Sequence, residues 1–170
     1  MSDIHIRLLH PADASAYRSL RLRGLREHPD AFTSSYEEDA QQPVSSAETR
    51  LASTRTTFWG AFRGNELYGI VGLEREPRAK NRHKATVVGM YVAPEASGQR
   101  LGVKLLEALV AQARTEGLEA LVLTVTEGNE AAQRLYERAG FRSFGIEPRA
   151  IKVDGRYYAK NHMLLQLESA

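Results

Sequence analysis

The chain has 170 residues, of which 42% are hydrophobic and 26% are charged, and its formal net charge is +2. This length suits one domain with a substantial core, and the composition is ordinary for a globular protein. The small net charge gives no support for nucleic-acid binding, and we interpret the two short basic groups as solvated faces or loops. The groups are Arg18, Arg21, Arg23 and Arg26, and Arg78, Lys80, Arg82 and Lys84.

The sequence contains no cysteine, which excludes disulfides, zinc–thiolate sites and thiol catalysis. Residues 1–5 carry no apolar signal region, and no run of the chain approaches membrane-spanning length. We therefore expect a cytoplasmic protein with no membrane partner. The histidines His5, His10, His28 and His162 have no ligand spacing, so we expect no metal site.

An amphipathic strand and an amphipathic helix are expected at the start of the chain. Apolar and polar residues alternate over residues 3–9, which predicts a strand with one buried face. A helix follows from Pro11 to the pair His28-Pro29, with Asp13 in its first turn. Residues 30–39 have no clear period and contain two aromatic residues, so we expect a loop or short helix that could lie over a cleft.

A short helix and three strands are expected next. Ser45-Ser46-Ala47-Glu48 has the form of a capping box, which predicts a helix start. Gly64-Asn65 predicts a tight turn between two strands. The expected elements are helix 46–54, strand 57–62, strand 67–76 and, after a basic loop over 77–84, strand 85–92.

Residues 87–106 are an apolar strand, a short polar loop with two glycines and the first turn of an amphipathic helix. This order can hold an anionic group at the helix start, although a purely structural turn fits these residues equally well. The spacing matches neither the Rossmann nor the P-loop fingerprint. The helix is expected from Val103 to Gly117. The apolar run 118–125 predicts a buried strand parallel to strand 85–92.

The last part of the chain predicts a capped helix and a long hairpin. Asn129 can cap a helix that ends at Gly140. Two strands over residues 141–167 are expected around Asp154-Gly155. Gly145 and Pro148 interrupt the first of these strands and suggest a bulge. We find no repeat or linker, and we expect one mixed α/β domain over residues 1–170.

This order of elements, together with Tyr136-Glu137-Arg138-Ala139-Gly140-Phe141, resembles the GCN5-related N-acetyltransferase (GNAT) family. The likeness covers almost the whole chain and is sharpest over residues 87–141. The acetyl-coenzyme A (acetyl-CoA) signature of the family is Gln or Arg, two residues, Gly, one residue, then Gly or Ala. On this chain it falls on Ser97–Gly102, where only Gly102 matches strictly and Arg100 replaces the first glycine. Arg100 is therefore expected to have an ordinary backbone conformation.

The resemblance implies the acyl-CoA N-acyltransferase fold: a twisted mixed sheet of about seven strands with flanking helices. Its parallel fourth and fifth strands splay apart to admit acetyl-CoA, whose pyrophosphate would lie on loop 97–102 and whose pantetheine would follow the fourth strand. The residues that the resemblance assigns to coenzyme binding are Met90, Tyr91, Val92, Ser97, Gly98, Gln99, Arg100, Leu101, Gly102, Val103 and Asn129.

The resemblance also gives Tyr136 the role of general acid toward the departing thiolate, whereas the residue pattern alone fits a tyrosine that fills a buried helix face. The general base is open, because Glu74 through a water, His83, or no dedicated base would each suffice. Phe32, Tyr36 and Glu74 are the predicted acceptor-binding residues, with the hairpin around residues 146–158.

The resulting functional hypothesis is direct transfer of acetyl from acetyl-CoA to a primary amine of a small molecule, an amino acid or analogue, or a peptide N-terminus. The lack of cysteine excludes a cysteine-linked acyl-enzyme. The alternative is a regulatory or interaction module that binds coenzyme A without transfer. Family resemblance also allows a homodimer through the C-terminal strands.

Overall fold

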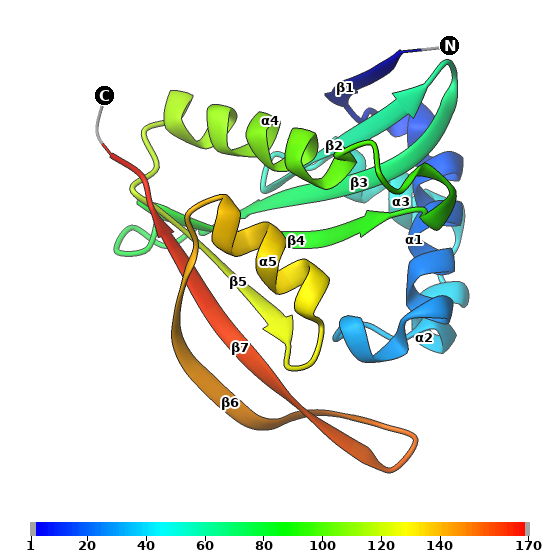
Figure 1. Cartoon of the computed structure of the whole chain (residues 1–170). Coiled ribbons are helices and arrows are strands. Elements are labelled where there is room, and N and C mark those ends of the chain that lie inside the picture. The colour runs from blue at the N-terminus through cyan, green and yellow to red at the C-terminus, as the bar shows by residue number, and fades with distance from the viewer. Residues whose placement is uncertain (1–2, 169–170) are drawn as a thin grey trace.

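The computed structural model describes residues 3–168 and contains one seven-stranded mixed sheet. The strands are β1 (Ile4–Leu8), β2 (Thr56–Arg63), β3 (Glu66–Arg75), β4 (Lys84–Val92), β5 (Ala120–Thr126), β6 (Arg142–Val153) and β7 (Arg156–Gln166). Their order is β1-β2-β3-β4-β5-β7-β6, and only β4 and β5 are parallel neighbours (Figure 1). The expected mixed sheet with a parallel fourth and fifth strand is therefore confirmed.

Helices cover both faces of the sheet. They are α1 (Ala14–Glu27), α2 (Tyr36–Ala40), α3 (Val44–Ala52), α4 (Leu101–Thr115) and α5 (Glu130–Arg138). The core under α1 and α3 includes Tyr17, Phe58 and Ile70, and we call this side the α1/α3 face. The core under α4 and α5 includes Leu105 and Phe141, and we call this side the α4/α5 face. In Figure 1, α4 and α5 lie in front of the sheet.

The parallel strands β4 and β5 stay paired over only a short distance. Their register covers Lys84–Thr86 against Ala120–Val122. Beyond these residues β4 continues beside β3 as far as Val92, while β5 pairs with β7 along its whole length. The two strands therefore diverge, as Figure 1 shows, and α5 lies in front of the space between them.

A β-bulge in β4 accompanies this divergence. Gly72 lies opposite Val88 and Ile70 lies opposite Tyr91, so β4 contains one more residue than β3 over this interval. Gly89 lies within it and has φ +63°, a conformation that glycine adopts without steric cost. We did not predict this bulge, although an isolated glycine in an apolar strand was its sequence signal.

The C-terminal hairpin confirms the sequence prediction. Asp154 and Gly155, with φ of 49° and 78°, form the two-residue turn between β6 and β7. The register of β6 shifts between Ser143 and Gly145 and again after Glu147, which confirms the bulged strand.

Three local expectations need correction. Helix α3, which begins at Val44, has Pro43 as its N-cap and no side-chain cap, so the capping-box prediction at Ser45 is wrong. Pro43 already supplies an extended backbone, with φ −72° and ψ 163°, from which a helix can start. Helix α4 begins at Leu101 rather than Val103, and β5 begins at Ala120 rather than residue 118. Over residues 3–168, no helix is long and apolar enough to cross a membrane.

Close packing of β3 against the α1/α3 core gives a first prediction. A Cβ atom at Gly72 would lie 2.6 Å from Cε1 of Phe58, whose side chain is only 2% exposed. Gly72→Ala is therefore expected to lower the free energy of unfolding by about 1–3 kcal/mol, because the ring has little room to move. Urea unfolding measures this change. Gly145→Ala is the control, since a Cβ atom there meets nothing within 4 Å; equal stability losses in both variants would contradict the packing explanation.

Candidate active site

A cavity of about 460 Å³ lies where β4 leaves β5. Its walls come from β4, the loop before α4, α5 and the segment that follows α1. The predicted residues that line it are Phe32, Met90, Tyr91, Val92, Ser97, Gly98, Arg100, Leu101, Gly102, Val103 and Asn129. We call it the β4/α5 cavity. It brings together the predicted coenzyme residues other than Gln99.

Two of the predicted acceptor-binding residues, Tyr36 and Glu74, lie outside this lining. Tyr36 lines a neighbouring cavity of about 490 Å³ between the segment after α1 and the tip of the β6–β7 hairpin, and Phe32 lines both cavities. Glu74 lies opposite Thr86, at the end where β4 and β5 are still paired. By strand register Glu74 shares the α1/α3 face with Phe58, but it lines neither cavity.

The loop before α4 differs from our expectation at one residue. Arg100 is the N-cap residue of α4 and has φ 58° and ψ 33°, which is the left-handed region. The prediction of an ordinary backbone conformation for Arg100 is therefore wrong. A non-glycine residue in this region costs about 1–2 kcal/mol. Leu101, Gly102 and Val103 form the first turn of α4, where N–H groups have no partner within the helix, and all three line the cavity.

Gly102, the strict motif match, has a packing role. A Cβ atom at this position would lie 3.0 Å from Cδ2 of Leu135 on α5. The absence of a side chain therefore lets the first turn of α4 approach α5 closely. Both residues line the β4/α5 cavity, so the distance between α4 and α5 at this contact limits the width of the cavity.

Asn129 is the N-cap residue of α5 and also lines the cavity. Its Oδ1 accepts a hydrogen bond of 3.3 Å from the backbone N–H of Ala132, which makes it the N-cap of α5. It also lines the β4/α5 cavity. The helix cap holds the side chain in a fixed position at the cavity wall.

Tyr136 lies in the core beneath α5. Its side chain is 7% exposed, and its ring packs edge-on against Phe141 with 5.9 Å between centroids. Burial raises the pKa of the Tyr136 hydroxyl above its usual range. Tyr136 is not among the residues that line the β4/α5 cavity, and it follows Leu135, which does line it.

A polar network links α1 to the end of β4. The Tyr91 hydroxyl donates a 3.1 Å hydrogen bond to Glu27, and burial together with this carboxylate raises the pKa of Tyr91 to about 12. Arg23 contacts Glu95 through two hydrogen bonds of 2.6 and 2.7 Å. These bonds lower the pKa of Glu95 to about 2. The network ties α1 to the turn that follows β4.

Sequence reasoning missed a second anchor, which holds the segment after α1. The Thr126 hydroxyl donates a 2.7 Å hydrogen bond to the carbonyl oxygen of Asp30 and accepts one of 2.9 Å from Nζ of Lys160. Lys160 is only 4% exposed, and burial lowers its pKa. The three residues are distant in sequence, so no local pattern could have indicated this contact. Within residues 3–168, no group of three or more acidic or histidine side chains could hold a metal ion.

Comparison with known proteins agrees with this geometry. Residues 22–141 match the model of the acetyltransferase (GNAT) family. The chain therefore belongs to that family. An acetyltransferase of the GNAT family from Streptococcus pneumoniae has the same fold, with a TM-score of 0.85, 23% identity and coverage of 98% of this chain and 100% of that one. A Salmonella typhimurium protein solved with its cofactor acetyl-CoA gives a TM-score of 0.82 at 23% identity, covering 99% and 96% of the two chains.

Curated relatives match parts of the chain. The L-methionine sulfoximine/L-methionine sulfone acetyltransferase of Pseudomonas aeruginosa is 37% identical over 79 residues, which are 46% of this chain and 46% of the relative. The mycothiol acetyltransferase of Brachybacterium faecium is 28% identical over 136 residues, which are 78% of this chain and 39% of the relative. These matches span about half or less of the relatives' own length.

The strained residue Arg100 gives a second prediction. Arg100→Gly is expected to raise the free energy of unfolding by about 1 kcal/mol relative to Arg100→Ala, because glycine enters the left-handed region without a steric penalty. Chemical unfolding of the two variants measures the difference. Gln99→Gly is the matched control and is expected to destabilise, since Gln99 does not have a positive φ. A stability of Arg100→Gly below that of Arg100→Ala would contradict the strain.

Proposed function

We propose that this protein is an N-acetyltransferase that moves the acetyl group of acetyl-CoA directly to a primary amine. The observation that carries the proposal is the β4/α5 cavity, where the diverging strands, the start of α4 and Asn129 meet. Family membership supports the same reaction class.

The donor groups around the cavity fit the coenzyme. Backbone N–H groups at the start of α4, together with the Arg100 guanidinium, suit a pyrophosphate. The edge of β4 from Met90 to Val92 is not paired with β5, and its backbone groups suit the amides of a pantetheine chain. Asn129 adds a polar side chain on the opposite wall.

The proposed transfer needs few protein groups. The amine nitrogen attacks the thioester carbonyl carbon, and a backbone N–H near Tyr91 stabilises the oxygen that becomes negative. The carbon–sulfur bond then breaks, and Tyr136 gives its proton to the departing thiolate. A phenol whose pKa is raised by burial stays protonated at neutral pH, as this role requires. The amine loses its proton to water.

The acceptor is expected to approach from the α1/α3 face and the segment that contains Phe32 and Tyr36. This segment and the β6–β7 hairpin together line the cavity next to the β4/α5 cavity. Relatives bear names that refer to methionine sulfoximine, to mycothiol and to the alanine of ribosomal protein bS18. A small amine, an amino acid analogue and a peptide N-terminus are therefore the classes to test.

A coenzyme A-binding module without transfer activity is the alternative, and the departures from the motif at Ser97 and Arg100 favour it. The left-handed backbone at Arg100 argues against loss of the loop, because the required turn is kept. The decisive experiment mixes the protein, acetyl-CoA and an amine panel and follows free thiol. Turnover on any amine supports the enzyme, whereas binding of acetyl-CoA without turnover on every amine supports the module.

The acid role of Tyr136 gives a third prediction. Tyr136→Phe is expected to lower kcat about 100-fold or more while the Kd for acetyl-CoA stays nearly constant, because only proton donation is lost. Tyr68→Phe is the control, since that hydroxyl bonds to the exposed Glu66 and lies outside the β4/α5 cavity. Steady-state kinetics and calorimetry measure the two parameters. Unchanged kcat in Tyr136→Phe would rule out the assignment.

A further inference from the structure

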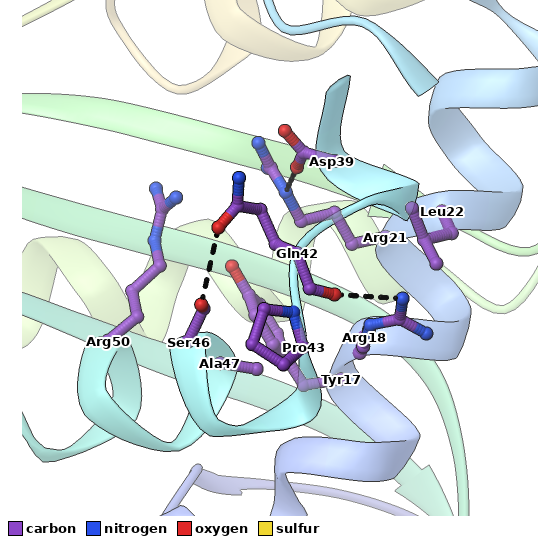
Figure 2. Close-up of a pocket in the computed structure, with 10 residues that line it drawn as sticks. All are labelled: Tyr17, Arg18, Arg21, Leu22, Asp39, Gln42, Pro43, Ser46, Ala47 and Arg50. Atoms are coloured by element: carbon purple, nitrogen blue, oxygen red, sulfur yellow. Dashed lines mark hydrogen bonds and ion pairs between the residues drawn. The ribbon is translucent and has the colours of Figure 1, made fainter. Parts of the chain in front are cut away.

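A third cavity opens on the α1/α3 face, between α1, α3 and the turn that connects α2 to α3. Its volume is about 160 Å³, which suits a small chemical group rather than a whole coenzyme. Figure 2 shows its wall, with Tyr17, Arg18 and Arg21 from α1 facing Ser46 and Arg50 from α3. We call it the arginine cavity. None of the residues that line the β4/α5 cavity belongs to it.

The residues that line the arginine cavity carry three positive charges and one negative charge, so hydrogen-bond donors and positive charge are in excess. Nε of Arg21 donates a 2.7 Å bond to Asp39, the only carboxylate among the lining residues. Arg18 donates to the carbonyl oxygens of Ala40 and Gln42, both at 3.1 Å. The Arg50 guanidinium has no ion-pair partner within residues 3–168.

Arg50 is nevertheless held in place. Its guanidinium carbon lies 5.1 Å from the centre of the Phe58 ring, which is a cation–π contact. The Phe58 ring is itself fixed by an edge-on contact with Tyr17, with 5.0 Å between centroids. Figure 2 shows that the guanidinium lies at the side of the cavity away from Arg18. A cation fixed in this way is preorganised for an anion.

Tyr17 supplies a second and independent observation. Its side chain is 2% exposed, yet its hydroxyl has no hydrogen-bond partner among the described residues. In Figure 2 the hydroxyl points into the space between Arg50, Ser46 and Gln42. A buried hydroxyl without a partner is destabilising, so the position calls for an acceptor from outside the chain. Burial raises the pKa of Tyr17, and the charges of Arg50 and Arg21 oppose this increase.

Arg21, a lining residue of the arginine cavity, extends toward the bulge in β4. Nη1 of Arg21 lies 3.9 Å from the point where a Cβ atom on Gly89 would stand, and Cε1 of Phe58 lies 3.4 Å from the same point. Gly89 is in the interval where β4 turns away from β5, beside Met90 of the β4/α5 cavity. A molecule bound in the arginine cavity would therefore lie next to the strand along which the thioester is proposed to lie.

We propose that the arginine cavity binds the carboxylate of the acceptor, so that the preferred acceptors are amines that also carry a carboxylate. The guanidinium groups of Arg21 and Arg50 can only donate hydrogen bonds, and the Tyr17 hydroxyl can donate one more. An ionised carboxylate can only accept hydrogen bonds, so it matches these three groups. Arg21 lines the arginine cavity and also lies beside Gly89, so the amine of the same molecule would reach β4 on this side. This inference rests on the proposed acetyl transfer.

The kinetic test compares each amino acid with its carboxamide. Wild-type protein is expected to acetylate L-amino acids or ω-amino acids with kcat/KM at least about 10-fold above that for the matching amides, because a charged hydrogen bond is lost in the amide. Arg50→Gln is expected to lower kcat/KM for the carboxylates about 10- to 100-fold and to leave that for the amides within about 2-fold. Equal kcat/KM for acids and amides in the wild type, or an unchanged preference in Arg50→Gln, would overturn the inference.

Two further variants separate recognition from folding. Arg55→Gln removes the same charge from an exposed side chain outside the arginine cavity and is expected to keep the preference for carboxylates. Tyr17→Phe removes the hydroxyl that has no partner, so it is expected to unfold at a denaturant concentration no lower than the wild type and to reduce the preference several-fold. A preference lost equally in Arg55→Gln would mean a general charge effect and would overturn the inference.

An acetate titration tests the cavity without any transfer step. Sodium acetate, against sodium chloride of equal ionic strength, is expected to raise the Tm of the wild type and of Arg55→Gln but not that of Arg50→Gln. If no amine is acetylated, the proposed function fails and the acceptor role of the cavity fails with it. In that case, an increase in Tm with acetate that still depends on Arg50 would show that the cavity binds carboxylates but has no role in acetyl transfer. An identical response in all three proteins would overturn the inference, because acetate would then act independently of Arg50.

Discussion

The short pairing between β4 and β5 is the constraint from which the rest of the structure follows. Hydrogen-bonded register is limited to Lys84–Thr86 against Ala120–Val122. After that point each strand has a different full-length partner, β3 for β4 and β7 for β5, so neither can bend back without losing its own ladder. The backbone groups at the inner edge of β4 are consequently available to a ligand, and the helices α4 and α5 close the space around them.

The two faces of the sheet beside the point where β4 and β5 separate carry different polar groups. The α4/α5 face presents helix-start amides, Arg100 and Asn129, which suit a phosphate and an amide chain. The α1/α3 face presents Arg21, Arg50 and a buried phenol, which suit a carboxylate. The bulge in β4 places Gly89, which has no side chain, between these two faces.

Local patterns were sufficient to predict most elements and the loop at the start of α4. Alternating apolar residues, the Asp154-Gly155 turn and the motif around Tyr136 each act over a few residues, so they are visible in sequence. The arginine cavity was not predictable, because Arg21 and Arg50 come from different helices and meet only when α1 packs beside α3. The left-handed backbone at Arg100 was also missed, since side-chain identity suggests a preference and the surrounding fold can override it.

Two energetically unfavourable features line cavities, one at Arg100 in the β4/α5 cavity and one at Tyr17 in the arginine cavity. Arg100 occupies a backbone region that disfavours side chains, and Tyr17 buries a hydroxyl without a partner. Each fault costs on the order of 1–3 kcal/mol, which is a notable part of the 5–15 kcal/mol that usually stabilises a domain. A glycine at residue 100 would remove the backbone strain, and a phenylalanine at residue 17 would remove the hydroxyl without a partner. Faults that are so simply repaired, and that both line a cavity beside the break in the sheet, are better explained by what each cavity binds than by the needs of folding.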